Sequence, residues 1–260
     1  MYKVTFKPES SFTSELHSST LFGAMCWAIA TLYGEDVLKE NVLENTDPES
    51  LAISDAFPEG WICTPLFNKE DADTITNEAG DKSATKFNTY KIEHCMIDRE
   101  LGTSKHHWFE NQHFTKENLV VYVVSNIFST DELTEILKFA FENGIGSRKS
   151  TGKGRFQIVG NIEEINSADI AEMVIPEWED ETYMVLGDYI PNESDEVDGS
   201  YSIRVINGRT VDGTSKEPVY VVNAGGVFRG NIETEAIGRL EKDVNTGTYT
   251  GGRAIVIQIA

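Results

Sequence analysis

The chain has 260 residues, of which 40% are hydrophobic and 10% aromatic, enough to bury the core of one large domain or of two small ones. It carries 43 acidic against 22 basic residues, so most of its surface should repel nucleic acid, and any contact with a polyanion must be local. A formal net charge of -21 could also serve solubility, adaptation to salt or the docking of a basic partner.

No stretch approaches 18 consecutive apolar residues, and residues 1–10 lack the apolar stretch of a secretory signal. The three cysteines are widely spaced and form no CxxC pair, which argues against a disulfide framework and a zinc knuckle. We therefore expect a protein of the reducing cytoplasm, with no metal site and no cofactor.

The N-terminal part of the chain, residues 1–174, has the pattern of an α+β domain. A Ser/Thr cluster stands at the start of the first predicted helix as its cap, and Ser129 or Thr130 can cap the second. The predicted elements are strand 2–8, helix 18–34, strand 118–126, helix 129–144 and strand 155–165. We also expect a strand between the first helix and residue 118. The order then matches the ferredoxin-like βαββαβ pattern that RNA-recognition domains also use.

Two further regions complete the predicted organisation. Residues 35–117 hold insertions, of which residues 68–86 are polar and predict an exposed, even disordered segment. The composition changes near residue 174, and strand-like runs follow, so residues 175–260 predict a second, β-rich domain.

The segment "GIGSRKSTGKGRF", residues 144–156, has four glycines, four cations and no acid. It is not a nucleotide-binding P-loop, because five residues separate Gly146 from Gly152 and Gly154 follows Lys153 where the motif needs Ser or Thr. It also follows a helix and precedes a strand, the reverse of the P-loop context. Glycine, cations and hydroxyls can hold a phosphodiester backbone. The alternative is a flexible hairpin whose cations only make it soluble.

Four motifs resemble the RAMP superfamily of CRISPR-associated RNA-binding proteins, in its Cas-five-like group that includes Csm complex subunit four. They are the glycine-rich loop ending in "GRF", "LHSSTLFGAMCWAI" (residues 16–29), "EHCMIDRELGTS" (residues 93–104) and "VNAGGVFRGNI" (residues 222–232). The four span most of the chain in the order that the family shows. The resemblance implies a ferredoxin-like domain with a glycine-rich loop and a second RAMP-like half.

The resemblance also implies a function and partners. Members of this group are non-catalytic subunits of type III-A effector complexes in antiviral defence. They hold the 5′ handle of the CRISPR RNA and link the large polymerase-like subunit to the backbone RAMP subunit. Target recognition is then left to base pairing by the guide. The family's RNA-binding positions correspond here to His17, Ser18, Ser19, Thr20, Arg99, Gly144, Gly146, Ser147, Arg148, Lys149, Ser150, Thr151, Gly152, Lys153, Arg155, Phe228 and Arg229.

The sequence leaves two other functions open. His17 could be the general base of a RAMP-type metal-independent endoribonuclease that processes precursor CRISPR RNA, although the sequence shows no evident partner for it. A viral or regulatory mimic that uses its acidity to block a complex is a weaker option. The remaining histidines lack metal-ligand spacing and predict loop or surface positions. Trp27 and Phe22 predict core positions, whereas Asp98 and Arg99 could form an ion pair that orders a hairpin.

Overall fold

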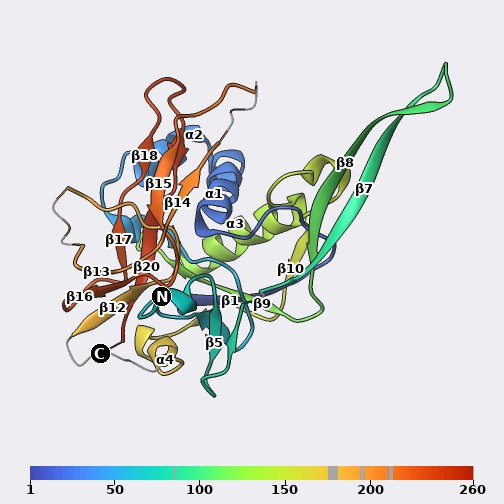
Figure 1. The fold of residues 1–260 in the computed structure, drawn as a ribbon. Coiled ribbons are helices and arrows are strands. Elements are labelled where there is room, and N and C mark those ends of the chain that lie inside the picture. Colours follow the sequence, from blue (N-terminus) through green and yellow to red (C-terminus); the bar gives the residue numbers. More distant parts are fainter. Residues whose placement is uncertain are drawn as a thin grey trace.

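The computed structural model describes residues 1–84, 86–174, 181–193, 195, 197–208, 210 and 213–259. An N-terminal sheet carries helices on one face and a β-rich C-terminal half on the other, and a long two-stranded ribbon projects from this body (Figure 1). No helix among the described residues is long and apolar enough to cross a membrane.

The N-terminal sheet is antiparallel and built around β1 (Tyr2–Pro8) and β9 (Leu119–Val124), in register with Val4 opposite Val121. The predicted strands at both places are confirmed. The other strands are β10 (Phe156–Ile158), β11 (Glu163–Glu164), β2 (Ala52–Ile53) and β3 (Phe57–Pro58). The principal strand order is β10-β1-β9-β2, with β11 pairing β1 and β3 pairing β9.

Every side chain of β9 is buried, because both faces of the sheet are covered. Val121 and Val123 point into a core with the helices, whereas Val120 and Tyr122, on the alternate positions, point into a core shared with the C-terminal half. This second core unites the two parts that the sequence predicts as separate domains. Residues 175–180, which follow the predicted boundary, lie outside the described residues, and the boundary stays a prediction.

Helices α1 (Ser18–Tyr33) and α3 (Thr130–Asn143) lie where the sequence predicts helices. The start of α3 is fixed by a capping box: Glu132 N–H donates to Ser129 Oγ at 3.4 Å, and Ser129 N–H donates to Glu132 Oε2 at 2.8 Å. Gly144 ends the helix at φ 91°, a region that favours glycine. The predicted cap and end of this helix are therefore confirmed.

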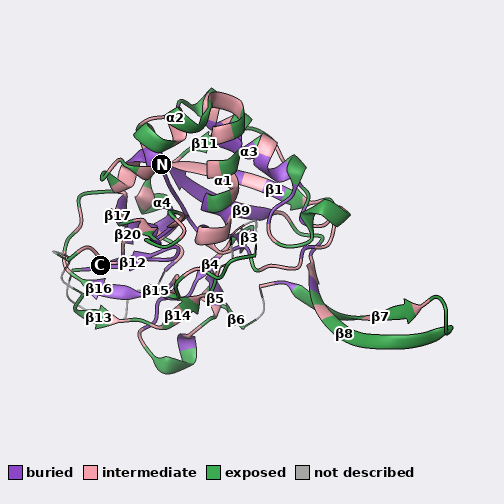
Figure 2. Cartoon of the chain, turned by 90° about the horizontal axis from the view of Figure 1, so that it is seen from above, coloured by how far each residue is buried: buried purple, intermediate pink, exposed green. Residues whose placement is uncertain are grey.

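The insertions form short elements and the ribbon. Residues 68–84 are ordered rather than disordered, because Ile75 is buried in the shared core and its strand pairs on both sides. The elements are α2 (Glu35–Leu38), a π-helix at Lys39–Leu43, 3₁₀ turns at Pro48–Ser50 and Lys69–Asp71, β4 (Trp61–Cys63), β5 (Ile75–Asn77), β6 (Lys82–Ser83), β7 (Asn88–Asp98) and β8 (Thr103–Phe114). Outside the insertions, the short helix α4 (Ser167–Ala171) follows β11. The ribbon consists of β7 and β8, and most of it is exposed (Figure 2).

The C-terminal half is β-rich, as predicted, and its strands pair antiparallel. Its main sheet has the order β13-β16-β12-β20-β17. Its strands are β12 (Thr182–Val185), β13 (Gly199–Ser200), β14 (Ile203–Ile206), β15 (Val219–Val222), β16 (Val227–Arg229), β17 (Ala236–Gly238), β18 (Glu241–Lys242), β19 (Tyr249–Thr250) and β20 (Arg253–Gln258). Strands β14 and β15 form a separate pair, and β20 contributes Ile255 and Ile257 to the shared core.

An aromatic cluster fixes the strand that follows the glycine-rich loop. Phe156 is fully buried, with its ring centroid 5.4 Å from Phe6 and 5.5 Å from Phe12. We predict that Phe156→Ala lowers the free energy of unfolding by about 3–5 kcal/mol, because it leaves a cavity between these rings. Urea unfolding measures this. Gln157→Ala, at an exposed neighbouring position, should change stability by less than about 0.5 kcal/mol. Equal effects of the two variants would contradict the placement of Phe156.

Candidate nucleic-acid interface

The glycine-rich loop, residues 144–155, connects α3 to β10 and contains a 3₁₀ turn, η4 (Lys149–Thr151). Arg148 precedes the turn in the left-handed region at φ 65°, and Gly152 follows it at φ 81°. A non-glycine residue held in this region costs on the order of 1 kcal/mol, and such strain is common at functional sites.

The glycines of this loop serve mainly its packing against the chain itself. A Cβ on Gly154 would lie 2.1 Å from the carbonyl oxygen of Ile145, and one on Gly146 would lie 2.6 Å from Ser14 Oγ. Of these three glycines, Gly152 alone has open space where a Cβ would lie. The expectation that the glycines leave the backbone open to phosphates therefore fits Gly152 but not Gly146 or Gly154.

Three of the four loop cations have partners within the chain. Arg148 Nε donates to Glu110 Oε2 at 2.9 Å, Lys149 Nζ lies 4.6 Å from the centre of the Trp27 ring, and Lys153 Nζ donates to Ser11 Oγ and Gln112 Oε1. Arg155 is exposed and forms no ion pair with another described residue. Arg148 is about half exposed and contacts Glu110 through Nε, so its terminal guanidinium N–H groups can still donate to a phosphate. The acceptors of Lys153 are neutral and leave its charge uncompensated.

Residues 9–17 run along the loop and then reach the start of α1. Ser147 N–H donates to Ser14 Oγ at 3.0 Å, and Thr13 Oγ1 lies 2.7 Å from Ser147 Oγ. The loop backbone continues this contact, because Gly154 N–H donates to the carbonyl oxygen of Ser11. Thr151 Oγ1 donates to the carbonyl oxygen of Arg148 inside the loop. The loop and the start of α1 are thus joined by one continuous segment.

The N-terminus of α1 is capped by two carboxylates that are distant in the sequence. Ser18 N–H donates to Asp55 Oδ1 at 2.8 Å, and Ser19 N–H donates to Asp188 Oδ2 at 3.2 Å. The Ser/Thr cluster provides no side-chain cap, so that prediction is wrong. These two helix N–H donors are already used by buried carboxylates, so they are not available to an anion. The geometry opposes the predicted phosphate contact of Ser18 and Ser19.

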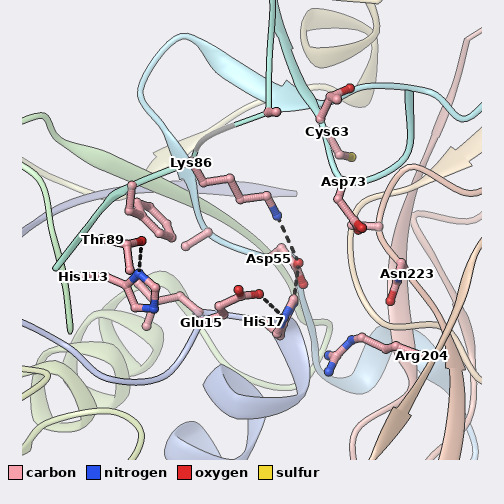
Figure 3. A pocket seen from close by; sticks show the side chains of 16 residues that line it. Glu15, His17, Asp55, Cys63, Asp73, Lys86, Thr89, His113, Arg204 and Asn223 are labelled. Carbon is pink, nitrogen blue, oxygen red and sulfur yellow. Dashed lines mark hydrogen bonds and ion pairs between the residues drawn. The ribbon is translucent and has the colours of Figure 1, made fainter. Parts of the chain in front are cut away.

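His17, at the N-cap position, lies between two carboxylates (Figure 3). Its Nδ1 is 2.9 Å from Asp55 Oδ2, and its Nε2 is 2.8 Å from Glu15 Oε2. Burial of the ring lowers its pKa, but attraction to Asp55 and the hydrogen bonds to Asp55 and Glu15 outweigh burial and raise the pKa to about 9. The imidazole is therefore protonated at neutral pH and cannot accept a proton as a general base.

Arg204 of β14 compensates the second carboxylate, with Nη2 lying 2.6 Å from both oxygens of Asp188. Donor atoms of His17, Asp55 and Asp188 lie within 4.8 Å of one another and could in principle surround a metal ion. The protonated ring of His17, the guanidinium of Arg204 and the two helix N–H groups all donate to these carboxylates. The group therefore fits a closed ion network better than a metal centre. The sequence does hold a signal for Asp55 and Asp188: each is a single acid inside an apolar run, "AISDAF" and "VLGDYI". Such an acid is expected to be buried and paired.

The aromatic residues at the predicted RNA contacts differ from expectation. Phe228 is fully buried between Tyr183 and Tyr201, with ring centroids 5.5 Å away on each side, so it cannot stack on a nucleotide. Arg229 is exposed and contacts Asp198. Phe22 is a core residue, as predicted, whereas Trp27 is 41% exposed beside the loop, and its prediction as a core residue is wrong.

Arg99 lies at the tip of the ribbon, far from the glycine-rich loop (Figure 1). Asp98 pairs with Lys105 rather than with Arg99 and accepts N–H donors from the ribbon turn. The ribbon histidines are spread along the strands, and His94 stacks on Trp108 instead of facing a metal cluster. The ribbon also exposes large apolar side chains, namely Tyr90, Ile92, Met96, Ile97, Leu101, Trp108 and Phe109.

A cavity of about 530 Å³ opens next to His17, where residues 15–17 meet the C-terminal half (Figure 3). Lys86 Nζ lies 3.6 Å from Asp55 Oδ2, and Asp73 reaches the cavity from the loop before β5. Its other lining residues are Glu15, Leu16, Ala56, Cys63, Thr74, Ala84, Phe87, Thr89, His113, Arg204, Asn223 and Ala224. The sequence did not indicate this cavity, because its walls come from segments far apart along the chain.

The RAMP superfamily model matches residues 8–157, more than half of the chain, so the chain belongs to the RAMP superfamily. The resemblance of its sequence motifs to that superfamily is thus confirmed. Comparison with curated protein sequences gives no match.

The fold extends over whole chains of solved Csm structures. In the crystal structure of the Csm3-Csm4 subcomplex in the type III-A CRISPR-Cas interference complex, a chain matches with a TM-score of 0.65 at 17% identity, over 98% of each chain. In the Csm1-Csm4 cassette in complex with cA4, the TM-score is 0.62 at 14% identity, over 100% of this chain and 98% of that chain. The subunit named in both structures is Csm4, whose fold this chain shares.

The network at α1 predicts a pH dependence of stability. The folded-state pKa of His17 lies above its ordinary value of 6.5, so its stabilising effect is complete below about pH 6.5 and is lost as the pH rises through about 9. The free energy of unfolding should fall across this window by on the order of 1–3 kcal/mol. His17→Gln should remove that slope, whereas His106→Gln, on the exposed ribbon, should keep it. Urea titrations at a series of pH values measure it, and a wild-type curve that is flat from pH 6.5 to 9 would contradict the network.

The loop glycines offer a matched pair of variants. Gly152→Ala and Gly154→Ala both place a side chain at positive φ, but only Gly154→Ala also collides with the backbone of Ile145. We predict that Gly154→Ala is the more destabilising by at least about 1 kcal/mol. Thermal or urea unfolding compares the two, and equal losses of stability would show that the loop does not pack as described.

Proposed function

We propose that this chain is a non-catalytic RNA-binding subunit of a type III-A CRISPR effector complex. In this proposal it holds the 5′ handle of the CRISPR RNA and joins a large polymerase-like subunit to a backbone RAMP subunit in antiviral defence. We also infer that the N-terminal sheet with α1 and α3 is a ferredoxin-like unit, because its strand order and its two helices on one face follow that pattern. We place the protein in the cytoplasm, where the guide RNA would be available.

The observation that carries this proposal is the end-to-end similarity of fold to chains from two kinds of Csm subcomplex. One pairs Csm4 with Csm3 and the other pairs it with Csm1, so a chain with the Csm4 fold has two partners available in such complexes. The similarity covers 98% or more of this chain and 98% of those chains, which leaves no large part of either without a counterpart.

The glycine-rich loop supports the RNA-binding part of the proposal. It gathers Arg148, Lys149, Lys153 and Arg155 on a chain that is otherwise strongly acidic. The backbone N–H groups of Gly146 and Arg148 have no hydrogen-bond acceptor among the described residues, so they can donate to phosphate oxygens. The exposed Trp27 beside Lys149 adds an aromatic ring at the edge of the loop.

The alternative of a metal-independent endoribonuclease is less well supported. Its candidate base, His17, is held between Glu15 and Asp55, and its pKa is raised to about 9. A base for RNA cleavage must be neutral to take the proton of a 2′-hydroxyl. We therefore assign His17 a role in positioning the start of α1 and the nearby cavity.

Replacement of two loop cations tests the proposed function. We predict that Arg148→Ala combined with Lys149→Ala weakens retention of small RNA on the chain purified from its native cells. The RNA bound per mole of protein should fall, and the salt dependence of the logarithm of the binding constant should become shallower by about 1.4, as expected for two lost contacts to single-stranded RNA. Quantified RNA from washes at rising salt measures both.

The matched control is Lys39→Ala combined with Lys242→Ala, which removes the same charge from exposed positions outside the loop. This control should retain RNA as the wild type does. Equal RNA content in the loop variant and the wild type would remove the loop from the interface. Absence of any defined small RNA from the wild-type preparation would contradict the proposed function as a whole.

A further inference from the structure

The cavity beside His17 is a second feature of the interface, and its charge differs from that of the loop. Its volume of about 530 Å³ lies within the range of small-ligand sites. The ionised side chains on its wall are three carboxylates and three cations, namely Glu15, Asp55, Asp73, His17, Lys86 and Arg204. Burial lowers the pKa of His113, so its imidazole is neutral near pH 7. Arg204 also pairs with Asp188 directly behind this wall, so carboxylates outnumber cations by four to three, which disfavours a phosphate and suits a neutral polar occupant.

Asp73 is the acid of this wall that remains available. Glu15 and Asp55 are held by His17 and Lys86, whereas the carboxylate of Asp73 forms no hydrogen bond or ion pair with another described residue. Its backbone lies in the left-handed region at φ 59°, and its side chain points toward the cavity (Figure 3). Asp adopts this backbone readily, so the feature that suggests a ligand contact is the exposed, unpaired carboxylate on the cavity wall.

The chemistry of an ionised carboxylate restricts the occupant. Two oxygens that only accept hydrogen bonds match two adjacent N–H donors with no acceptor between them. Among the four RNA bases, guanine alone offers this arrangement, through N1–H and the N2 amino group. Adenine and cytosine present a ring nitrogen acceptor beside their amino group, and uracil presents carbonyl oxygens on both sides of its N–H. A carboxylate would repel each of those acceptors.

The position of the cavity relative to the loop suits one strand of RNA. Ser14 contacts the glycine-rich loop, and His17, three residues later, lines the cavity. Three residues of extended chain span at most about 11 Å. A strand whose phosphates lie on the loop can therefore place a neighbouring unstacked base at the cavity. The ring of Phe87 and the side chain of Leu16 supply apolar wall for the base.

We propose that this cavity receives one unstacked guanine of the bound RNA, with the Asp73 carboxylate accepting from N1–H and N2–H. The proposal rests on the proposed RNA-binding function and adds a base preference to it. The loop holds phosphates without regard to sequence, and the cavity reads one base.

Short RNA probes test this inference on the purified full chain. The probes are octamers of uridine that carry one central guanosine, one central adenosine or no replacement, and fluorescence anisotropy measures their dissociation constants at fixed salt. We expect the guanosine octamer to bind about tenfold more tightly than the other two. Asp73→Asn should abolish the preference and leave the affinity for all-uridine RNA unchanged, since Asn tolerates the left-handed backbone and the loop is intact.

Glu70→Gln is the matched control, because Glu70 is exposed on the same stretch of chain, loses the same charge and does not line the cavity. It should keep the guanosine preference. Equal binding of all three octamers, or a preference that survives Asp73→Asn, would overturn this inference and leave the RNA-binding function standing. Failure of the wild type to bind any octamer would contradict the RNA-binding function and this inference together.

Discussion

The buried carboxylates Asp55 and Asp188 at the start of α1 organise this molecule. Isolated buried charges are costly, so each must be compensated, and the chain supplies His17 with a helix N–H for one and Arg204 with a helix N–H for the other. Asp55 comes from the N-terminal part and Asp188 from the C-terminal half. The helix start is thereby fixed to both, and the segment that leads from the loop into the helix ends at a defined place.

This arrangement separates two kinds of surface that lie close together. The loop keeps positive charge on a chain of net charge -21, so a polyanion is attracted there and repelled over most of the rest. The cavity three residues beyond Ser14 has more carboxylates than cations and an unpaired acid, which suit a base edge rather than a phosphate. Phosphate contacts position an RNA strand, and base contacts specify it.

Local patterns were sufficient to predict the elements that depend on near neighbours in sequence. The alternation in residues 2–8, the capping box of α3 and the apolar β9 run all encode their structure within a few residues. The cap of α1 could not be found in this way, because its acceptors are distant in the sequence. Asp55 lies 37 residues from the N–H group that donates to it, and Asp188 lies 169 residues from its donor. The prediction that Phe228 contacts RNA was wrong for a related reason. Its glycine neighbours suggested an open loop, whereas three tyrosine rings surround it in the fold.

The cavity illustrates the same limit at the level of the site. Its wall combines Asp55, Asp73 and Arg204, which share no motif and meet only after the two halves pack. The loop, by contrast, is one contiguous stretch and was recognisable from composition, although the role of its glycines was not. Contacts with the chain itself account for Gly146 and Gly154, and this could be seen only once Ser14 and Ile145 were placed beside them.

The most direct test of the account is ultraviolet crosslinking of the chain to its guide RNA in the complex isolated from native cells, followed by mass spectrometry of the crosslinked peptides. The account predicts crosslinks in the glycine-rich loop, in residues 9–17 and near Asp73. Crosslinks confined to the outer strands of the C-terminal sheet, with none in the loop, would contradict it.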